Sequence, residues 1–375
     1  MDPEEKGSTY AEAGVDIEGE GRAIRGLISA LKFRREGFGK MADLEGGFTG
    51  LIDLGDHYLS LCTDGVGSKL IIAKVLQKWD TVGIDCMAMN VNDMICIGAE
   101  PLAFVDYIAA ESPDPGILRE IGIGLNEGAR QSNLSIVGGE TASLPEIVKH
   151  LDLAGTCLGY VKKEDLITGE SIGAGTILIG LPSTGLHSNG FSLVRKVIMD
   201  NSLSYVSPLA EVVSSKEWSG KRRFPGYMKE VEEWAASDGS SILGEILLTP
   251  TRIYVKDVIP LIRALPKGAV QGMSNITGGG IRNVCRMKDG LKYVVATPLP
   301  VPPVFRLLQV LGGIEENEMH QTFNMGLGMC IAVHPDHADE ALVRLKDAGG
   351  RRIGFVEEGK GVAIPGQNIH YPGYV

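Results

Sequence analysis

The sequence predicts an α+β protein built from two α/β-sandwich domains. Its 375 residues exceed the usual length of one domain, and 44% of them are hydrophobic, as expected for sizeable buried cores. Apolar segments with strand spacing and helix spacing alternate, and several predicted strands are close enough in sequence to pair in antiparallel fashion. A charged and then glycine-bearing stretch at 162–175 divides the chain into an N-terminal domain, 1–165, and a C-terminal domain, 166–375.

The N-terminal domain is predicted to combine helices and strands. Arg22 to Arg35 carries apolar residues at helical spacing and ends in a basic cluster, which suits the C-terminus of a helix. Asp114 followed by Pro115 predicts the cap and first turn of a helix that reaches Ser132. The other elements expected here are a strand at 58–62, helices at 70–76 and 85–97, and strands at 101–109, 134–137 and 151–161.

The C-terminal domain repeats this alternation around a poorly patterned interval. Residues 201–246 are rich in serine and lack a clear period, so we expect a surface insertion there. The expected elements are strands at 176–181, 270–275, 329–333 and 352–356, and helices at 191–199, 304–311 and 337–348.

The composition disfavours several classes of protein. A net charge of −11 argues against broad nucleic-acid binding. The chain contains no run of 18 or more apolar residues, and its acidic N-terminus does not resemble a signal peptide. The six cysteines include no C-x-x-C pair, which indicates free thiols in a reducing compartment. We therefore expect a cytoplasmic protein that binds neither nucleic acid nor membrane.

The segment Thr63-Asp-Gly-Val-Gly-Ser-Lys69 lies between a predicted strand and a predicted helix. A glycine turn before a helix can bind phosphate through backbone N–H groups. This turn also carries a carboxylate and an ammonium, and a carboxylate beside a phosphate usually requires a divalent metal between them. We therefore expect a phosphate-bearing nucleotide and a divalent metal such as Mg²⁺ here, with contacts from Asp64, Gly65, Gly67, Ser68 and Lys69.

Three acids are candidate metal ligands: Asp64, Asp93 and Glu140. Each lies at or beside the end of a predicted apolar element, with glycine or asparagine nearby, where carboxylates can hold Mg²⁺. Any one of them could instead cap a helix or turn, but three in one half of the chain favour a metal–nucleotide site. Gly138 and Gly139 are expected to join Glu140 at the nucleotide. Neither G-x-x-x-x-G-K-[ST] nor G-x-G-x-x-G occurs, so ATP would need another type of loop.

Two further glycine motifs are candidates for substrate binding. His187-Ser-Asn-Gly190 opens a predicted helix, where backbone amides can face an anion. His187 could contact charge that develops during catalysis, or it could be a packed loop residue. Thr277-Gly-Gly-Gly280 lies between a strand and a helix, and three glycines are costly unless a ligand approaches closely. The expected substrate contacts are Gly47, Phe48, Ser188, Asn189, Gly190, Thr277, Gly278, Gly279 and Asn324.

Nine segments together match a known family: Tyr10 to Asp16, Thr63 to Lys69, Val91 to Asp93, Gly98 to Pro101, Val137 to Thr141, His187 to Gly190, Pro250 to Lys256, Thr277 to Gly280 and Phe323 to Gly328. On these segments the chain resembles the phosphoribosylformylglycinamidine cyclo-ligases along nearly its full length. The acidic and glycine motifs are shared with a wider superfamily of ATP-using enzymes. The opening motif and the 250–256 motif are more specific.

The resemblance implies a homodimer in which the N-terminal sheets pair and nucleotide binds near the interface. It also implies ATP-driven closure of formylglycinamidine ribonucleotide to 5-aminoimidazole ribonucleotide in purine biosynthesis. In such enzymes the amide oxygen is phosphorylated before an amidine nitrogen attacks. Carried onto this sequence, catalysis is expected to involve Lys69, Asp93 and His187. The chain departs from the family pattern in a shorter early glycine loop, 44–48, and in Ser143 to Glu146.

Other superfamily enzymes and a non-catalytic scaffold are the alternatives. A selenophosphate synthetase would need a cysteine in the early glycine loop, and none occurs between 36 and 50. A formylglycinamidine synthetase would need a much longer chain or partner subunits. A thiamine-phosphate kinase gives no reason for the 250–256 and 277–280 motifs. An inactive nucleotide-binding scaffold would not need Asp64, Asp93, Glu140 and His187 intact.

Overall fold

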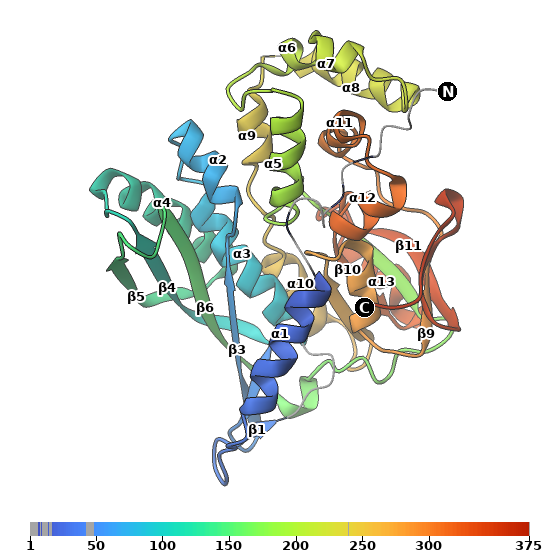
Figure 1. Cartoon of the computed structure of the whole chain (residues 1–375). Coiled ribbons are helices and arrows are strands. Elements are labelled where there is room, and N and C mark those ends of the chain that lie inside the picture. The colour runs from blue at the N-terminus through green and yellow to red at the C-terminus, as the bar shows by residue number, and fades with distance from the viewer. Residues whose placement is uncertain are drawn as a thin grey trace.

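The computed structural model describes residues 7, 9, 14, 17–42, 49–238 and 240–374, and it confirms the predicted α+β class with two sheets (Figure 1). The first sheet has the strand order β1-β2-β3-β6-β4-β5, and the second has the order β13-β12-β9-β11-β7-β10-β8. Each sheet is built from one half of the sequence, as the alternating pattern predicted. Gly47 and Phe48, predicted to contact substrate, lie outside the described residues.

The N-terminal sheet is antiparallel except for its last pair, since β4 and β5 run parallel. Its strands are β1 (Met41–Ala42), β2 (Gly50–Asp53), β3 (His57–Gly65), β4 (Glu100–Ala110), β5 (Ser135–Ser143) and β6 (Leu151–Lys162). The helices of this half are α1 (Ile17–Ala30), α2 (Lys69–Leu76), α3 (Val82–Ile95) and α4 (Pro115–Ser132), followed by the short η1 (Lys163–Asp165).

The C-terminal sheet is antiparallel except where β12 pairs with β9. Its strands are β7 (Ile177–Pro182), β8 (Val270–Asn275), β9 (Leu291–Val295), β10 (Leu327–Val333), β11 (Arg351–Glu358), β12 (Gly361–Ile364) and β13 (Ile369–Tyr371). The α-helices are α5 (Phe191–Asp200), α6 (Leu209–Val213), α7 (Lys216–Ser219), α8 (Pro225–Asp238), α9 (Leu243–Leu247), α10 (Val255–Ala264), α11 (Pro303–Gly312), α12 (Glu316–Thr322) and α13 (Ala338–Arg344). Short 3₁₀ turns are η2 (Gly280–Arg286), η3 (Pro335–His337) and η4 (Pro365–Gln367).

Three expectations about local structure need correction. The helix expected to end in the basic cluster 32–35 ends at Ala30, so the cluster lies beyond α1. The strand expected to stop at Val137 continues as β5 through the Gly-Gly-Glu-Thr motif, because this stretch pairs with β4 along its whole length. The interval 201–246 is not irregular: it forms α6, α7 and α8, which lie together at the top of Figure 1, and then enters α9, which packs against α2. Trp218 on α7 and Val231 on α8 are buried, and both helices pack against α11, so α11 contributes to the core of this region.

Helix α3 lies at the centre of the molecule, between the N-terminal sheet and the C-terminal half (Figure 1). It contacts β3, β4 and β6 on one side and α10 and β8 on the other. Every residue of α3 except Ile84 and Asp93 is buried. A helix that is apolar on most of its surface is expected only in such an enclosed position.

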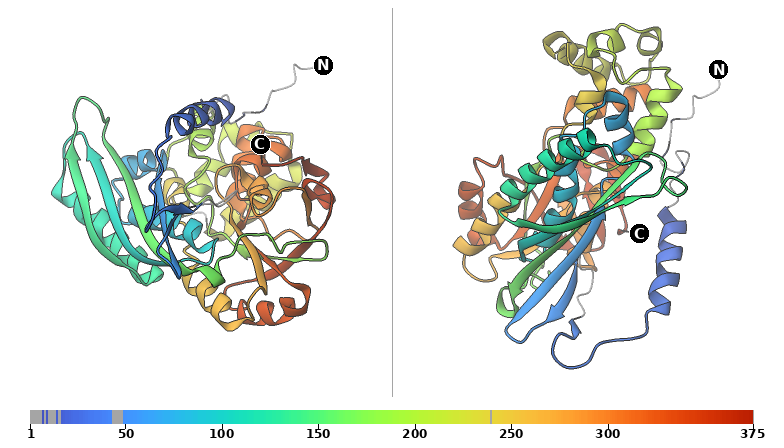
Figure 2. Two further views of the ribbon diagram at one scale, coloured as in Figure 1. Left: turned by 90° about the horizontal axis from the view of Figure 1, so that it is seen from below. Right: turned by 90° about the vertical axis from the view of Figure 1, so that its left-hand side faces the viewer.

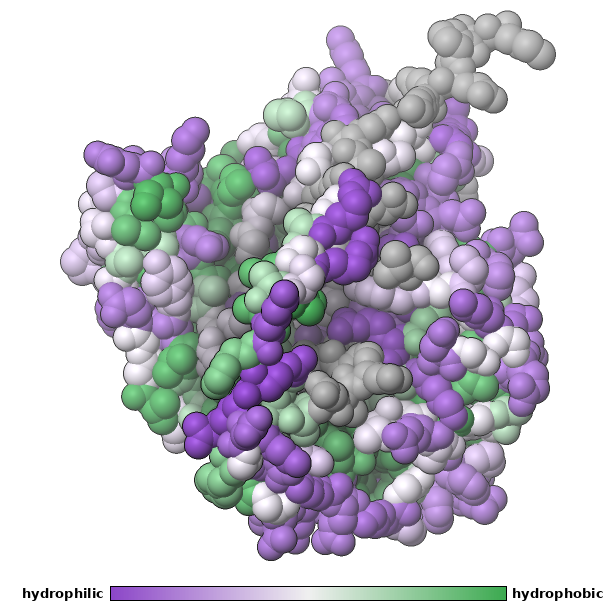
Figure 3. Space-filling view, turned by 60° about the horizontal axis from the view of Figure 1, so that its bottom comes forward, coloured by the Kyte–Doolittle hydropathy of each residue, from purple (hydrophilic) through white to green (hydrophobic). Residues whose placement is uncertain are grey.

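The face of the N-terminal sheet that points away from α3 is not covered by any described helix, and Figure 2 shows this sheet at one side of the molecule. Apolar side chains are exposed on that sheet, notably Leu61, Val105, Tyr107 and Val137. Seen from below, a band of hydrophilic residues crosses the front of the molecule with apolar residues on both sides of it (Figure 3). In the part of the chain that the structure describes, no helix is long and apolar enough to cross a membrane.

Candidate active site

One face of α3 gathers three of the motifs picked out from the sequence. Asn90 Nδ2 donates to the carbonyl oxygen of Asp64 at 3.3 Å, in the 63–69 turn. Asn189 Nδ2, in the 187–190 loop, lies 3.9 Å from Met89 Sδ. Asp93, one turn further along α3, accepts a 2.8 Å hydrogen bond from Asn275, which lies two residues before the 277–280 loop. Residues three and four apart share a helix face, so these loops meet along one line.

The 250–256 motif is joined to the same helix through Asn92. Asn92 is fully buried; its Nδ2 donates to the carbonyl of Arg252 at 2.8 Å, and its Oδ1 accepts from Tyr254 N at 3.0 Å. Tyr254 in turn donates to the carbonyl of Pro182 at the end of β7. The motif therefore links α3 to the C-terminal sheet, which is a structural reason for its specific sequence.

Asp93 is the partly exposed acid at the centre of this arrangement. Burial raises the pKa of its carboxyl to about 7, although the Asn275 hydrogen bond and the positive charge of Arg286 act in the opposite direction. Asp64 adds a smaller repulsion that also raises this pKa. A carboxylate held in this way is short of positive charge, and a cation would relieve it.

Asp64 lies at the end of β3, beside the glycine turn. Its Oδ1 accepts a hydrogen bond from Gly65 N at 2.7 Å, and burial raises the pKa of its carboxyl. Burial, followed by the charges of Asp93 and Asp64, raises the pKa of Cys62, so both acids lie near this thiol. Gly67 has φ of 73° with open space around its Cα, and Ser68 makes no capping bond, so the turn itself is accessible.

Lys69 does not fit its predicted contact with phosphate. Its side chain is fully buried, and Nζ donates to Asp85 Oδ1 at 2.9 Å and to the carbonyls of His187 and Thr249 at 2.9 and 2.8 Å. A lysine ammonium has three hydrogens, and all of them are used within the protein. The position of Lys69 between the glycine turn and the helix suggested that it binds phosphate. In the structure, the same position directs its side chain into the core.

The three predicted metal ligands are not gathered on one face of the sheet. Asp64 pairs with Gly155, Gly155 with Asp106, and Asp106 with Gly139, so the side chains of Asp64 and Asp106 share a face. Glu140, the next residue on β5, pairs with Tyr107 and projects from the opposite face. Within the described residues, no three acidic, histidine or cysteine side chains form a ready-made metal site.

Asp106 therefore occupies the position that the sequence analysis gave to Glu140. A Cβ on Gly139 would lie 2.5 Å from Asp106 Oδ1, so the carboxylate rests directly over the glycine backbone. Burial raises the pKa of Asp106, as it does that of Asp64. Gly138, by contrast, has no neighbour closer than 3.8 Å to such a Cβ.

His187 is packed inside the protein, the alternative that its loop position left open. Its side chain is 2% exposed, and Nε2 accepts a hydrogen bond from Thr184 N at 3.3 Å. Burial, with the charges of Lys69 and Arg252, lowers the pKa of the imidazole to about 3, so the ring is neutral at physiological pH. The backbone at His187 has φ of 61°, in the left-handed region that non-glycine residues rarely adopt.

The residues after His187 and the glycines of the 277–280 loop face one another. Ser188, Asn189, Thr277 and Gly278 are partly exposed, and a Cβ on Gly278 would lie 3.4 Å from Asn189 Oδ1. Gly279 and Gly280 have φ of 100° and 55°, and a Cβ on Gly280 would lie 2.0 Å from the His320 carbonyl. Backbone geometry therefore explains these two glycines, and Gly278 alone of the three is free for close approach of a ligand.

Gly190 and Asn324 also have structural roles. A Cβ on Gly190, where φ is 77°, would lie 2.3 Å from the Phe323 ring. Asn324 is buried; its Oδ1 accepts from Ser183 Oγ and Gly326 N at 2.9 Å, and its Nδ2 donates to the Gly185 carbonyl at 2.8 Å. These bonds use the polar atoms of Asn324 to hold the turn before His187, which differs from the predicted substrate contact.

The sequence analysis missed four residues of this region: Asp85, Asp106, Asn275 and Arg286. Asp106 is the single acid in the predicted strand 101–109, and that isolation was the available signal. Asn275 and Arg286 flank the 277–280 loop, but nothing local indicates that they approach Asp93 from another sheet.

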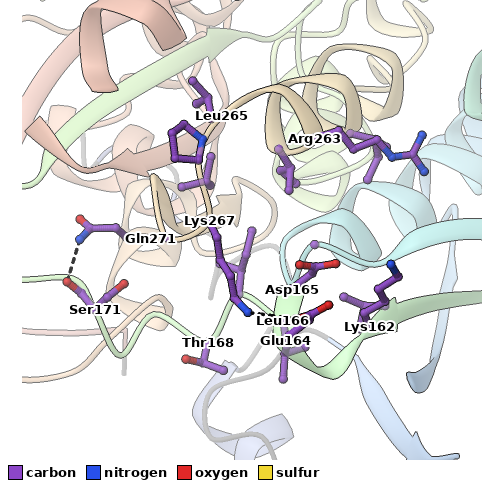
Figure 4. Close-up of a pocket in the computed structure, with 18 of the residues that line it drawn as sticks. Lys162, Glu164, Asp165, Leu166, Thr168, Ser171, Arg263, Leu265, Lys267 and Gln271 are labelled. Atoms are coloured by element: carbon purple, nitrogen blue, oxygen red, sulfur yellow. Dashed lines mark hydrogen bonds and ion pairs between the residues drawn. The ribbon is translucent and has the colours of Figure 1, made fainter. Parts of the chain in front are cut away.

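One cavity among the described residues lies away from this region. It has a volume of about 630 Å³ and is lined by the 162–171 segment, the end of β6 and α10 (Figure 4). Charged groups on its rim pair with one another: Arg263 with Glu100, and Lys267 Nζ with Glu164 Oε2 at 3.5 Å. None of the predicted site residues lines it.

Comparison with known proteins gives a consistent assignment. Residues 46–161 match the family model "AIR synthase related protein, N-terminal domain", and residues 173–366 match the corresponding C-terminal domain model. The phosphoribosylformylglycinamidine cyclo-ligase of Methanococcus vannielii is 46% identical over 334 residues, which cover 89% of this chain and 87% of that protein. The protein of the same name from Methanosarcina barkeri is 43% identical over 354 residues, covering 94% and 96%.

Solved structures share the fold at low sequence identity. The structure described as AaThiL complexed with AMPPCP and TMP has a TM-score of 0.56 at 14% identity and covers 96% of this chain and 98% of its own. The hydrogenase maturation protein HypE in complex with ATP has a TM-score of 0.54 at 16% identity, covering 82% and 78%.

Proposed function

The chain belongs to the phosphoribosylformylglycinamidine cyclo-ligase family and is thus a ligase, and we propose that it closes the imidazole ring of 5-aminoimidazole ribonucleotide. The substrate is formylglycinamidine ribonucleotide, and ATP is converted to ADP and phosphate in this step of purine biosynthesis. The observation that carries the proposal is the convergence on α3, where Met89, Asn90 and Asp93 each contact a different glycine-bearing segment. The descriptions of two structural neighbours name ATP or AMPPCP, which supports use of ATP by this fold.

Asp64, Asp93 and Asp106 are the residues that would hold Mg²⁺ beside the nucleotide phosphates. Their carboxylate oxygens are the hard donors that this ion prefers, and Mg²⁺ bound with phosphates needs only one or two of them. Burial raises the pKa of all three, so each would gain from a nearby cation. The ion would neutralise charge on the transferred phosphoryl group.

The accessible backbone of Gly65, Gly67 and Ser68 would bind the triphosphate. On the facing side, Ser188, Asn189, Thr277 and Gly278 would hold the ribonucleotide, since they are partly exposed and adjoin one another. These contacts set the formyl amide against the terminal phosphate of ATP. Holding reactants in this way can lower a barrier by on the order of 7–11 kcal/mol.

The proposed chemistry proceeds in two steps. The amide oxygen attacks the terminal phosphorus of ATP, ADP leaves, and an iminophosphate forms. An amidine nitrogen then attacks the activated carbon, the carbon–oxygen bond breaks, and inorganic phosphate leaves with the oxygen as the ring closes. His187 is neutral and buried, so its part is structural support of the 187–190 loop rather than proton transfer.

We further propose a homodimer formed through the bare face of the N-terminal sheet. Exposed apolar side chains cluster on this sheet: Leu61, Val105, Tyr107 and Val137. Clustered apolar residues, unlike single ones, are typical of an interaction surface. Glu140 lies on this same face, so it would serve a nucleotide site only where two copies meet. Residues 1–165 would then carry ATP binding and dimerisation, and residues 166–375 would bind the ribonucleotide.

Phosphate release measured with and without formylglycinamidine ribonucleotide tests the function. Release that depends on this substrate and yields the aminoimidazole product is the expected result. ATP-dependent phosphorylation of thiamine monophosphate instead would favour a kinase of the same fold. Absence of turnover with every acceptor, in a protein that still binds ATP, would leave only a scaffold role.

A further inference from the structure

The ion pair of Lys69 and Asp85 has no place in the chemistry above, and both side chains are fully buried. Asp85 Oδ1 accepts from Lys69 Nζ at 2.9 Å, from Thr251 N at 2.8 Å and from Thr251 Oγ1 at 2.5 Å. Lys69 also donates to the carbonyls of His187 and Thr249. The pair therefore joins the starts of α2 and α3 to two loops that follow more than a hundred residues later.

Stability alone is a poor reason for such a pair. Removing two charges from water costs several kcal/mol each, and well-packed apolar residues often replace a buried pair without loss of stability. Apolar residues could not replace the directional hydrogen bonds of the pair, because Lys69 donates to one particular carbonyl in each loop. A buried ion pair of this kind can specify one backbone arrangement over others.

The carbonyl that Lys69 holds belongs to a strained residue. His187 has φ of 61°, a conformation that costs an L-residue with a side chain roughly 1–2 kcal/mol. The hydrogen bond from Lys69 offsets this cost and sets the direction in which the chain enters Ser188 and Asn189. Ser188 Oγ lies 3.4 Å from Thr251 Oγ1, so the same network reaches the first of these two residues directly.

We propose that Lys69 is a positioning residue, which with Asp85 presets the 187–190 loop to receive the ribonucleotide. This inference rests on the proposed function, because the loop is assigned there to substrate rather than to ATP. It replaces the contact with phosphate expected from the sequence, and it assigns Asp85 a role. Lys69 acts through the backbone of His187 and touches no ligand.

The test compares steady-state kinetics of Lys69→Arg, Lys69→Met and the double variant Lys69→Met/Asp85→Asn. The double variant leaves no unpaired buried charge and keeps an acceptor for Thr251, so it is expected to fold even if Lys69→Met does not. With the wild type active, we expect the double variant to raise the KM for formylglycinamidine ribonucleotide or lower kcat by about tenfold or more. Its Kd for Mg-ATP should change less than about twofold, and Lys69→Arg should recover part of the loss.

Lys78→Met is the matched control, since Lys78 is partly exposed and pairs with Asp80 at the surface. It should behave as the wild type. The proposal is overturned if the double variant has wild-type kinetics, whatever its thermal stability, or if its only defect is weaker Mg-ATP binding. Failure of the wild type to turn over the ribonucleotide would count against the proposed function instead. The wild-type assay alone reports that outcome, so the two failures can be told apart.

Discussion

Asn275 donates a 2.8 Å hydrogen bond to Asp93. Asn275 is the last residue of β8 in the C-terminal sheet, and Asp93 lies on α3, which packs against the N-terminal sheet. Asn275 is 2% exposed, whereas Asp93 is one of two residues of α3 that are not buried. The contact thus places the acid at the seam between the two halves, with one side fixed by an amide and the other open.

Replacing Asp93 by Asn should weaken binding of Mg-ATP. The substitution keeps the size of the side chain but removes the charge that would face the cation, and we expect a loss of roughly tenfold or more in affinity. Calorimetric titrations with ATP at several Mg²⁺ concentrations measure this affinity. Asp56→Asn, at an exposed position in the turn before β3, is the control. Equal Mg-ATP affinity in wild type and Asp93→Asn would remove Asp93 from the metal site.

Gly139→Ala should destabilise the protein, and Gly138→Ala should not. The added methyl at 139 would meet Asp106 at 2.5 Å, while at 138 the nearest atom lies 3.8 Å away, an ordinary contact. Overpacking of this kind costs about 1–3 kcal/mol. Thermal unfolding of the two variants provides the comparison, and similar melting temperatures for both would show that Asp106 moves away freely.

Glu316→Gln should lower stability at neutral pH but not in acid. Burial disfavours the charge of Glu316, but the nearby His320, the hydrogen bond from Gln309 and the charge of Arg306 outweigh it and lower the pKa to about 2. The unfolded value is near 4.5, so the charged form stabilises the fold above pH 4.5, and this contribution is lost as the pH falls towards 2.

We expect a loss of about 1–3 kcal/mol in the free energy of unfolding at pH 7, shrinking below pH 4.5. Denaturant unfolding at a series of pH values gives the profile. Glu233→Gln is the control, because Glu233 is exposed on α8 and lies 3.7 Å from Lys229. A stability difference that stays constant from pH 7 to pH 3 would contradict the assigned ionisation.

Val105→Asp should give a monomer if the bare face of the N-terminal sheet is the dimer interface. Val105 is 39% exposed among other apolar residues, and a charge there would have to be buried when two copies meet. Light scattering after size exclusion reports the mass. Val343→Asp, at a site 74% exposed on α13, should leave the mass unchanged. A Val105→Asp protein that remains dimeric would place the interface elsewhere.

Periodicity and capping predicted most regular elements of the fold. The helix from Pro115 to Ser132 follows from its cap, since Asp114 accepts hydrogen bonds from Gly116 N and Ile117 N. The β5 strand was cut short at Val137 because glycines usually end strands, whereas here Gly139 makes room for Asp106 on the neighbouring strand. That reason lies in a strand 33 positions away in sequence, so no local pattern could have revealed it.

The candidate site was predicted by motif but not by side-chain direction. The 63–69, 187–190 and 277–280 segments do meet, yet Lys69 and His187 point into the core and Glu140 projects from the far face of the sheet. Residue type and spacing do not determine which way a side chain turns at the end of a strand. Lys69 is the clearest case, because its acceptors are 16, 118 and 180 positions away.

The enclosure of α3 has a consequence for how ligands enter. A hinge opening at 162–175 would strip α10 and β8 from this helix and bring its apolar surface into water. Large rotations between the two halves are therefore costly, and ligands are expected to enter along the rim, where Gly67 is exposed and Asn189 and Gly278 are partly exposed. We therefore expect the two halves to stay packed on α3 while ligands bind and products leave.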